Sequence, residues 1–124
     1  MCSLQTILDK IELQVLTEPL EYSQIEITSG YTSDLLSCVM TGAQADGIWV
    51  TLIANINIVA VASLLEIPAI IITENAQPDA ATIARANREE IVLLSTPVGS
   101  YQIVGKLWER SEERRVGKEC RSRW

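Results

Sequence analysis

Short apolar segments alternate with segments of helical periodicity along most of this 124-residue chain, and this alternation limits the folds open to it. Runs rich in branched aliphatic residues are typical of strands, whereas apolar residues three and four positions apart are typical of helices. From the second strand onward the two types alternate, which indicates an α/β fold: a mostly parallel sheet of about five strands with helices on its faces. We predict strands over 13–16, 24–28, 48–53, 69–73 and 91–94, and helices over 4–10, 35–40, 55–66, 78–88 and 99–109.

Residues that favour turns and helix starts mark several of the expected boundaries. Ser3 can cap the first helix, because its hydroxyl can accept a hydrogen bond from a free backbone N–H group. Ser33 or Asp34 can cap the helix at 35–40 in the same way. A turn is expected at residues 29–31, where Gly30 tolerates a tight backbone conformation.

The segment 55–66 is ambiguous, because it is apolar nearly all round. Its length, its alanines and its end just before Pro68 favour a helix over a strand. A helix with so little polar surface is either buried under its neighbours or shared with a second subunit. We expect the second arrangement, and therefore a homodimer.

The charge of the chain is distributed unevenly. The sequence has ten Lys and Arg residues against 16 Asp and Glu residues, a formal net charge of −6. Six of the ten basic residues and three of the 16 acidic residues lie in 110–124, so residues 1–109 keep four basic and 13 acidic residues, a charge of −9. A body this acidic repels nucleic acid and anionic membranes, and neither is expected as a partner.

The last segment, 110–124, differs from the rest of the chain in composition. It contains one aliphatic residue, Val116, and shows neither a helical nor a strand period. It also matches the in-frame translation of a common short-read sequencing adapter over its whole length. We therefore expect one domain over 1–109, followed by a non-native, disordered tail over 110–124. The alternative is a basic tail that binds nucleic acid.

Neither a membrane segment nor a metal site is expected. No apolar run approaches the roughly 18 residues that span a bilayer, and the N-terminus lacks the features of a signal peptide, which favours a cytoplasmic location. The cysteines Cys2, Cys38 and Cys120 are widely spaced and histidine is absent, so the usual zinc and iron–sulfur patterns are missing. We expect no cofactor.

The sequence also argues against an enzyme. The segment from Gly99 to Lys106 resembles a phosphate-binding P-loop, but it has five residues between the glycines instead of four. Leu107 follows the lysine where a P-loop needs Ser or Thr for magnesium. No histidine is available as a general base, and no serine has a base partner in the pattern, so a hydrolase triad is not expected.

Small polar residues follow several of the predicted strands. The carboxyl ends of parallel strands meet at one edge of a sheet, where open α/β folds bind ligands. Turn and helix-cap chemistry also favours small polar residues at these positions. We predict a ligand site in which Gly30 allows a tight turn, Tyr31 offers a stacking surface and the helix start at residues 33–34 supplies backbone donors. The candidate residues are Gly30, Tyr31, Ser33, Asp34, Asn55 and Thr96.

Five segments carry a resemblance to a known family: Gly-Tyr-Thr-Ser-Asp-Leu-Leu-Ser at 30–37, Trp-Val-Thr at 49–51, Asn-Ile-Val-Ala at 57–60, Ala-Ile-Ile-Ile at 69–72 and Leu-Ser-Thr-Pro at 94–97. Together they resemble the stand-alone DRTGG-domain proteins, over roughly residues 3–109. These proteins are similar to the N-terminal domain of HPr kinase/phosphorylase. Of the Asp-Arg-Thr-Gly-Gly motif that names the family, only Gly30 is present, at about residues 27–31.

The resemblance implies a function without catalysis. Similar domains are accessory parts of phosphotransacetylases, and of regulated pyrophosphatases that also contain CBS domains, where they often lie at dimer contacts. It implies a homodimeric regulatory module that binds an adenine nucleotide or a partner protein. The alternative is a structural accessory subunit of a hydrogenase or another redox complex. The labels serine kinase and iron–sulfur hydrogenase, which such chains sometimes carry, have no support in this sequence.

Overall fold

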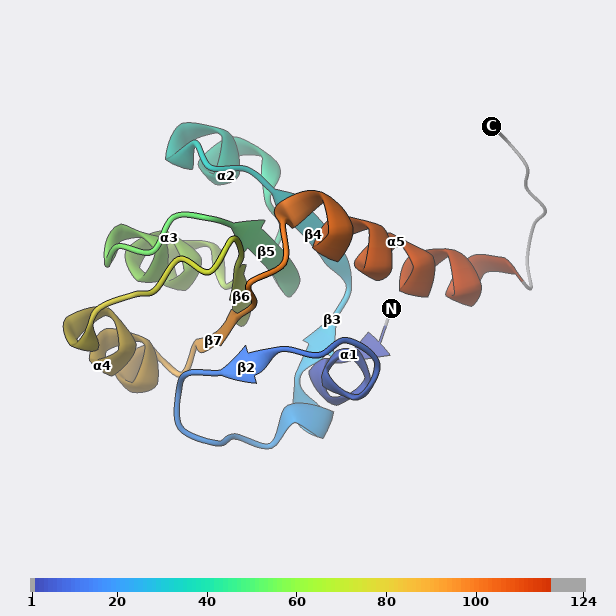
Figure 1. Ribbon diagram of the computed structural model, residues 1–124, viewed down its shortest axis with the longest axis horizontal. Coiled ribbons are helices and arrows are strands. Elements are labelled where there is room, and N and C mark those ends of the chain that lie inside the picture. Colours follow the sequence, from blue (N-terminus) through green and yellow to red (C-terminus); the bar gives the residue numbers. More distant parts are fainter. Residues whose placement is uncertain (1, 117–124) are drawn as a thin grey trace.

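A five-stranded sheet lies between two layers of helices in the computed structural model, which describes residues 2–116 and the side chains of residues 2–109 (Figure 1). The strands β4 to β7 run parallel to one another, and β2 pairs antiparallel with β7 at the edge. This arrangement confirms the predicted α/β fold with a mostly parallel sheet. In order across the sheet the strands are β2 (Gln14–Val15), β7 (Val92–Ser95), β6 (Ala69–Ile72), β5 (Gly47–Thr51) and β4 (Ser29–Thr32).

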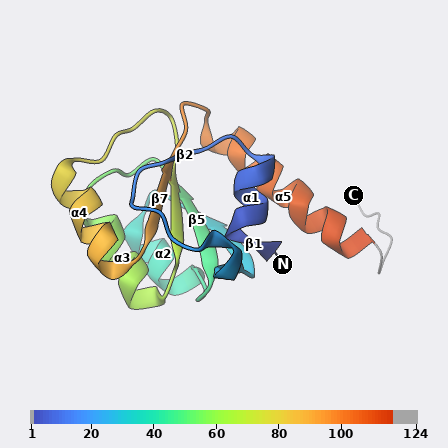
Figure 2. The ribbon, with the colours of Figure 1, turned by 90° about the horizontal axis from the view of Figure 1, so that it is seen from below.

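The helices that connect the parallel strands all cover the same face of the sheet. They are α2 (Leu36–Gly42), α3 (Asn57–Leu65) and α4 (Ala80–Glu89), and α3 packs between the other two. The opposite face is covered by α1 (Leu4–Lys10) and α5 (Ser100–Val116) (Figure 2). In the part of the chain that the structure describes, no helix is both long and apolar enough to cross a membrane.

Each face of the sheet carries its own hydrophobic core, because successive side chains of a strand point to opposite faces. On β5, Ile48 and Val50 face α1 and α5, whereas Trp49 faces the layer of α2, α3 and α4 and is fully buried. The central strand β6 is buried along its whole length, as expected for a strand covered on both faces.

A small second sheet lies beside the main one. Its strands β1 (Cys2–Ser3) and β3 (Glu26–Ile27) pair antiparallel, and the 3-10 helix η1 (Tyr22–Gln24) precedes β3. The strand predicted at 24–28 is therefore shorter than expected and does not join the main sheet. Leu4 donates its backbone N–H to the carbonyl of Ile25, at 2.8 Å, which holds this segment against the start of α1.

The turn predicted at residues 29–31 is wrong, because these residues begin strand β4. Gly30 lies opposite Ile48 and Tyr31 lies opposite Trp49 in parallel pairing with β5. No glycine in the described part of the chain has a positive φ, so Gly30 does not serve as a turn residue. Tyr31 and Thr32 have high strand propensity, and pairing with β5 satisfies the backbone where a turn had been expected.

Two of the helix starts are capped by side chains. The Ser3 hydroxyl accepts from Thr6 N–H at 3.3 Å, as predicted, and the Asp79 carboxylate accepts from Thr82 N–H at 2.9 Å. The cap predicted for α2 is wrong: its N-cap is Leu35, which has no side-chain oxygen. Helix α5 continues to Val116, beyond the predicted end at 109. The domain boundary at 109 stays a prediction, and residues 117–124 of the expected tail lie outside the described residues.

Candidate functional site

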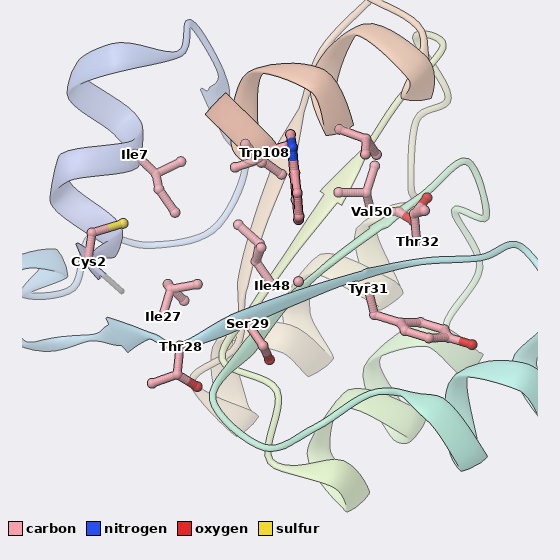
Figure 3. Close-up of a pocket in the computed structure, with 13 residues that line it drawn as sticks. Cys2, Ile7, Ile27, Thr28, Ser29, Tyr31, Thr32, Ile48, Val50 and Trp108 are labelled. Carbon is pink, nitrogen blue, oxygen red and sulfur yellow. The ribbon is translucent and has the colours of Figure 1, made fainter. Parts of the chain in front are cut away.

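An apolar pocket of about 330 Å³ opens between strand β4 and helix α5; we call it the β4–α5 pocket (Figure 3). Its floor is formed by the backbone of β4 and by the side chains of Ile48 and Val50 on β5. One wall comes from the N-terminal part of the chain and the other from α5. The lining residues are Cys2, Ile7, Ile27, Thr28, Ser29, Gly30, Tyr31, Thr32, Ile48, Val50, Val104, Leu107 and Trp108.

The pocket exists because side chains are missing where the sheet reaches its edge. The neighbouring Ile27 belongs to β3, which pairs with β1 and leaves the plane of the main sheet. Gly30 faces the α1 and α5 side with no side chain at all, since its register partner Ile48 points to that face. A Cβ built on Gly30 would lie 3.7 Å from Cγ2 of Ile48, an ordinary van der Waals contact that leaves the fold undisturbed.

Helix α5 supplies the aromatic wall of the pocket. Val104 and Leu107 are half-buried against the core, which fixes the rotation of the helix. That rotation brings Trp108 to the mouth of the pocket, where it is 52% exposed. In Figure 3 the indole of Trp108 points from α5 toward the strands, above Ile48. One face of an aromatic ring is therefore available beside an apolar floor.

No lining residue of the pocket carries a formal charge. Of the hydroxyl side chains in the lining, three already donate to backbone carbonyls: Thr28 to Asp46 at 3.4 Å, Thr32 to Val50 at 3.0 Å and Tyr31 to Cys38 at 3.2 Å. An ion bound here would lose hydration without meeting an opposite charge, which is costly. The pocket suits an apolar or aromatic group with a few hydrogen-bonding positions.

Only two of the six predicted site residues line this pocket. Gly30 leaves space in the pocket because it has no side chain, and Tyr31 lines the pocket through its position in β4. The Tyr31 ring turns to the other face of the sheet, where its hydroxyl donates to the carbonyl of Cys38 at 3.2 Å, so the stacking role predicted for it is not supported (Figure 3).

Three of the other four predicted residues are occupied by local hydrogen bonds. Ser33 accepts from Leu35 N–H at 3.1 Å, so the donors expected at this helix start are partly used within the turn. Asn55 accepts from Asn57 N–H at 2.9 Å, and buried Thr96 accepts from Val98 N–H at 3.1 Å. These three side chains shape the loops at the carboxyl edge of the sheet.

Asp34 belongs to a chain of hydrogen bonds along that edge. Its Oδ1 accepts from the hydroxyl of Thr51 and from the backbone N–H of Leu52, both at 2.8 Å. Farther along, the Thr73 hydroxyl lies 2.6 Å from the hydroxyl of Ser100. These bonds join the loop after β4 to the end of β5, and the end of β6 to the start of α5. The presence of Asp34 at this position is therefore explained by its structural role.

The topology shows where the carboxyl edge of the sheet could open a crevice. Ligands bind there in open α/β sheets at a switch point, where successive connections leave toward opposite faces. Here the parallel strands follow one another in sequence order, and α2, α3 and α4 lie on one face. The exception is at β6 and β7, because β6 leads to α4 on this face whereas β7 leads to α5 on the opposite face. The two loops are joined there by backbone hydrogen bonds from Glu74 N–H to the carbonyl of Val98 and from Asn75 N–H to the carbonyl of Thr96, both at 3.0 Å.

The sequence analysis missed the residues that make the walls of the pocket. Ile7 and Ile27 come from segments that are predicted only as helix and strand, and Cys2 precedes the first predicted element. Their meeting depends on the β1–β3 pairing. Trp108 falls within the helix predicted over 99–109, but a helical pattern does not tell a half-exposed residue from a buried one. The available signal for this site was Trp108 near the end of the helix, together with Gly30 in the strand that the helix faces.

Comparisons with known proteins identify the fold. No protein-family model matches the sequence, and no curated protein matches it. The structure is similar to a crystal structure of the CBS and DRTGG domains of the regulatory region of Clostridium perfringens pyrophosphatase, complexed with the activator diadenosine tetraphosphate. The TM-score is 0.67 at 18% sequence identity, and the match covers 83% of this chain and 44% of that chain. The fold is thus that of part of a regulatory region, consistent with a DRTGG domain.

Proposed function

We propose that this chain is a non-catalytic regulatory module that binds a small ligand in the β4–α5 pocket and acts as a homodimer. The observation that carries the proposal is the pocket itself, which joins an apolar floor to the half-exposed ring of Trp108. Its volume of about 330 Å³ lies within the range of small-molecule sites, roughly 300–1,000 Å³. Exposed apolar surfaces of this kind often mark ligand-binding or interaction sites in folded domains.

An adenine-containing compound is the ligand we propose. The regulatory region with a similar fold was crystallised with an adenine dinucleotide activator. Adenine is a flat ring that can stack on an indole and bury its apolar faces, and the β4–α5 pocket offers both contacts. Binding would then change how the module associates with its partner, as expected for a regulatory domain.

The homodimer is supported by the outer surface of α3. Its inner face is buried through Ile58, Val59 and Ala62. Three other apolar residues are spaced four positions apart and are exposed: Ile56 at the start of the helix, Ala60 and Leu64. The exposed fraction of Leu64 is 68%. Residues spaced in this way share one side of a helix, so α3 presents an apolar stripe outward.

Thermal unfolding of the full chain, with and without adenosine, AMP and ATP, tests the ligand proposal. A ligand that binds only the native state stabilises it by mass action, by about 2.7 kcal/mol at a concentration one hundred times Kd. We expect a concentration-dependent rise of the midpoint with at least one compound. No shift with any of them would contradict the proposal.

The variant Gly30→Val tests whether the ligand binds in the β4–α5 pocket. A valine there meets only an ordinary contact with Ile48 and has higher strand propensity than glycine, so we expect a folded protein. Its methyl groups would enter the pocket and abolish the ligand-induced shift. The matched control is Gly105→Ala on α5, whose new Cβ would meet no atom within 4 Å and should leave the shift intact.

A second candidate is a structural accessory subunit of a hydrogenase or another redox complex. It is favoured by large apolar side chains that are exposed outside the pocket, among them Leu35 at 59% and Met40 at 47%. Such a subunit would co-purify stably with the larger enzyme and bind no small molecule. The thermal-unfolding experiment separates the two candidates, since only the first expects a ligand-dependent midpoint.

A further inference from the structure

We infer that the β4–α5 pocket selects an uncharged planar ring compound of the nucleobase or nucleoside class, and that it discriminates against phosphorylated forms. The inference rests on the proposed function and specifies the ligand of the same site. It comes from the charges on and around the pocket, which do not favour the polyphosphate of a nucleotide.

The first step concerns the cations. Among residues 2–109, whose side chains the structure describes, the basic residues are Lys10, Arg85, Arg88 and Lys106, and none of them lines the pocket. Arg85 and Arg88 lie on α4, on the opposite face of the sheet, and Arg85 is paired with Glu89 at 3.4 Å. A phosphate at the mouth of the pocket would therefore meet no neutralising side chain among the lining residues.

The second step concerns backbone groups that can replace a cation. The start of a long helix can hold a phosphate through its free N–H groups. Helix α5 begins at Ser100, eight residues before Trp108, which is about 12 Å along the helix axis. A Cβ on Gly99 would lie 3.4 Å from Oε2 of Glu74, so a carboxylate already stands beside this helix start. That carboxylate would repel an added phosphate.

The third step concerns size and shape. The pocket lies at the lower end of the range for small-molecule sites, so it accommodates one ring system with a sugar rather than a dinucleotide. The open ring of Trp108 provides a stacking surface, and stacking does not depend on charge. The full chain carries a formal net charge of −6, so each phosphate added to the ligand increases the overall repulsion.

Isothermal titration of the full chain with adenosine, AMP and ATP, without magnesium, tests the inference. At low ionic strength we expect adenosine to bind with a Kd about tenfold or more below that of ATP, with AMP between them. Raising the salt shortens the Debye length from about 30 Å at 0.01 M to about 8 Å at 0.15 M, so ATP binding should strengthen while adenosine binding stays constant. Tripolyphosphate alone should give no heat of binding.

The outcomes separate this inference from the proposed function. If ATP binds more tightly than adenosine, or weakens as salt is added, the selectivity is wrong while ligand binding survives. If no compound binds, both the ligand proposal and this inference are overturned. Trp108→Leu keeps an apolar side chain but removes the stacking ring, so it should raise the Kd for adenosine by about tenfold; unchanged affinity in this variant would overturn the assignment of the site.

Discussion

Gly42 and Gly105 both lie in helices, but their surroundings differ. A Cβ on Gly42 would stand 2.5 Å from the hydroxyl oxygen of Tyr31 and 2.6 Å from two of its ring carbons. The Tyr31 ring would have to move and give up its hydrogen bond to the Cys38 carbonyl. We expect Gly42→Ala to lower the free energy of unfolding by about 1–3 kcal/mol, as overpacked sites do. Urea denaturation measures this change.

Two controls make that prediction specific to the contact with Tyr31. Gly105→Ala meets open space, so it should raise the stability by about 0.5–1 kcal/mol through helix propensity. In a Tyr31→Ala background the cost of Gly42→Ala should disappear, because the clashing ring is gone. A cost that persists in this background would mean that the helix end, and not the ring, rejects the methyl group.

At the scale of single residues, the sequence identified residues that matter for the structure, but it did not predict their roles correctly. Gly30 was selected for a turn, yet it matters because a side chain is missing from an edge strand. Asp34 was selected as a helix cap or ligand contact, yet it accepts hydrogen bonds from Thr51 and Leu52 across the sheet edge. Both roles depend on register with β5, and register is set by contacts distant in sequence.

Helix α4 depends on its first residues, and here the carboxylate of Asp79 is the main cap. The hydroxyl and the backbone N–H of Thr82 both donate to this carboxylate, at 2.7 and 2.9 Å, and these bonds lower the pKa of Asp79 from its ordinary value. A carboxylate whose pKa is lowered by folding stabilises the native state above its unfolded pKa of about 3.9. That contribution is lost as the pH falls through the lower, folded value.

We therefore expect Asp79→Asn to change the pH dependence of stability more than the stability at neutral pH. Asparagine caps helices about as well as aspartate but does not titrate. The thermal midpoints of the two proteins should be close at pH 7, and the native chain should lose more stability than the variant as the pH falls below about 4. Asp79→Ala should have a lower midpoint at neutral pH. Parallel pH profiles for the native chain and the asparagine variant would contradict this assignment.

At the scale of elements, the apolar periodicity placed the helices and the central strands well, because burial on one or both faces leaves a local pattern. The strands β5, β6 and β7 all overlap their predicted ranges. The N-terminal elements were less predictable. The two-residue strands β1 and β3 are too short to show a period, and only their pairing with each other defines them.

At the scale of the whole molecule, the proposals rest on two surfaces of the described residues, the β4–α5 pocket and the outer surface of α3. The helices that carry them, α5 and α3, lie on opposite faces of the sheet (Figure 2). The topology follows from the order of strands and helices in the sequence. The pocket does not, because its walls come from three regions of the chain that only the folded structure brings together. Ligand binding and dimerisation should therefore be separable by mutation.

The apolar stripe on α3 leads to the prediction for the assembly. We expect sedimentation velocity to show a reversible dimer for the full chain, and Leu64→Glu to shift it toward monomer by placing a charge in the contact. Leu64 is 68% exposed, so the variant should keep the unfolding free energy of the monomer within about 0.5 kcal/mol. Tyr101→Glu, at a residue that is 93% exposed on α5, is the matched control and should remain dimeric.

The same experiment shows whether the two surfaces act independently. Leu64→Glu should still bind adenosine with the native Kd, whereas Gly30→Val should still form the dimer, because the sheet lies between the two sites. Loss of dimer in the Gly30→Val variant would place the subunit contact at β4 instead of α3. A native chain that sediments as a monomer at every concentration would contradict the homodimer and leave the pocket as the only proposed contact.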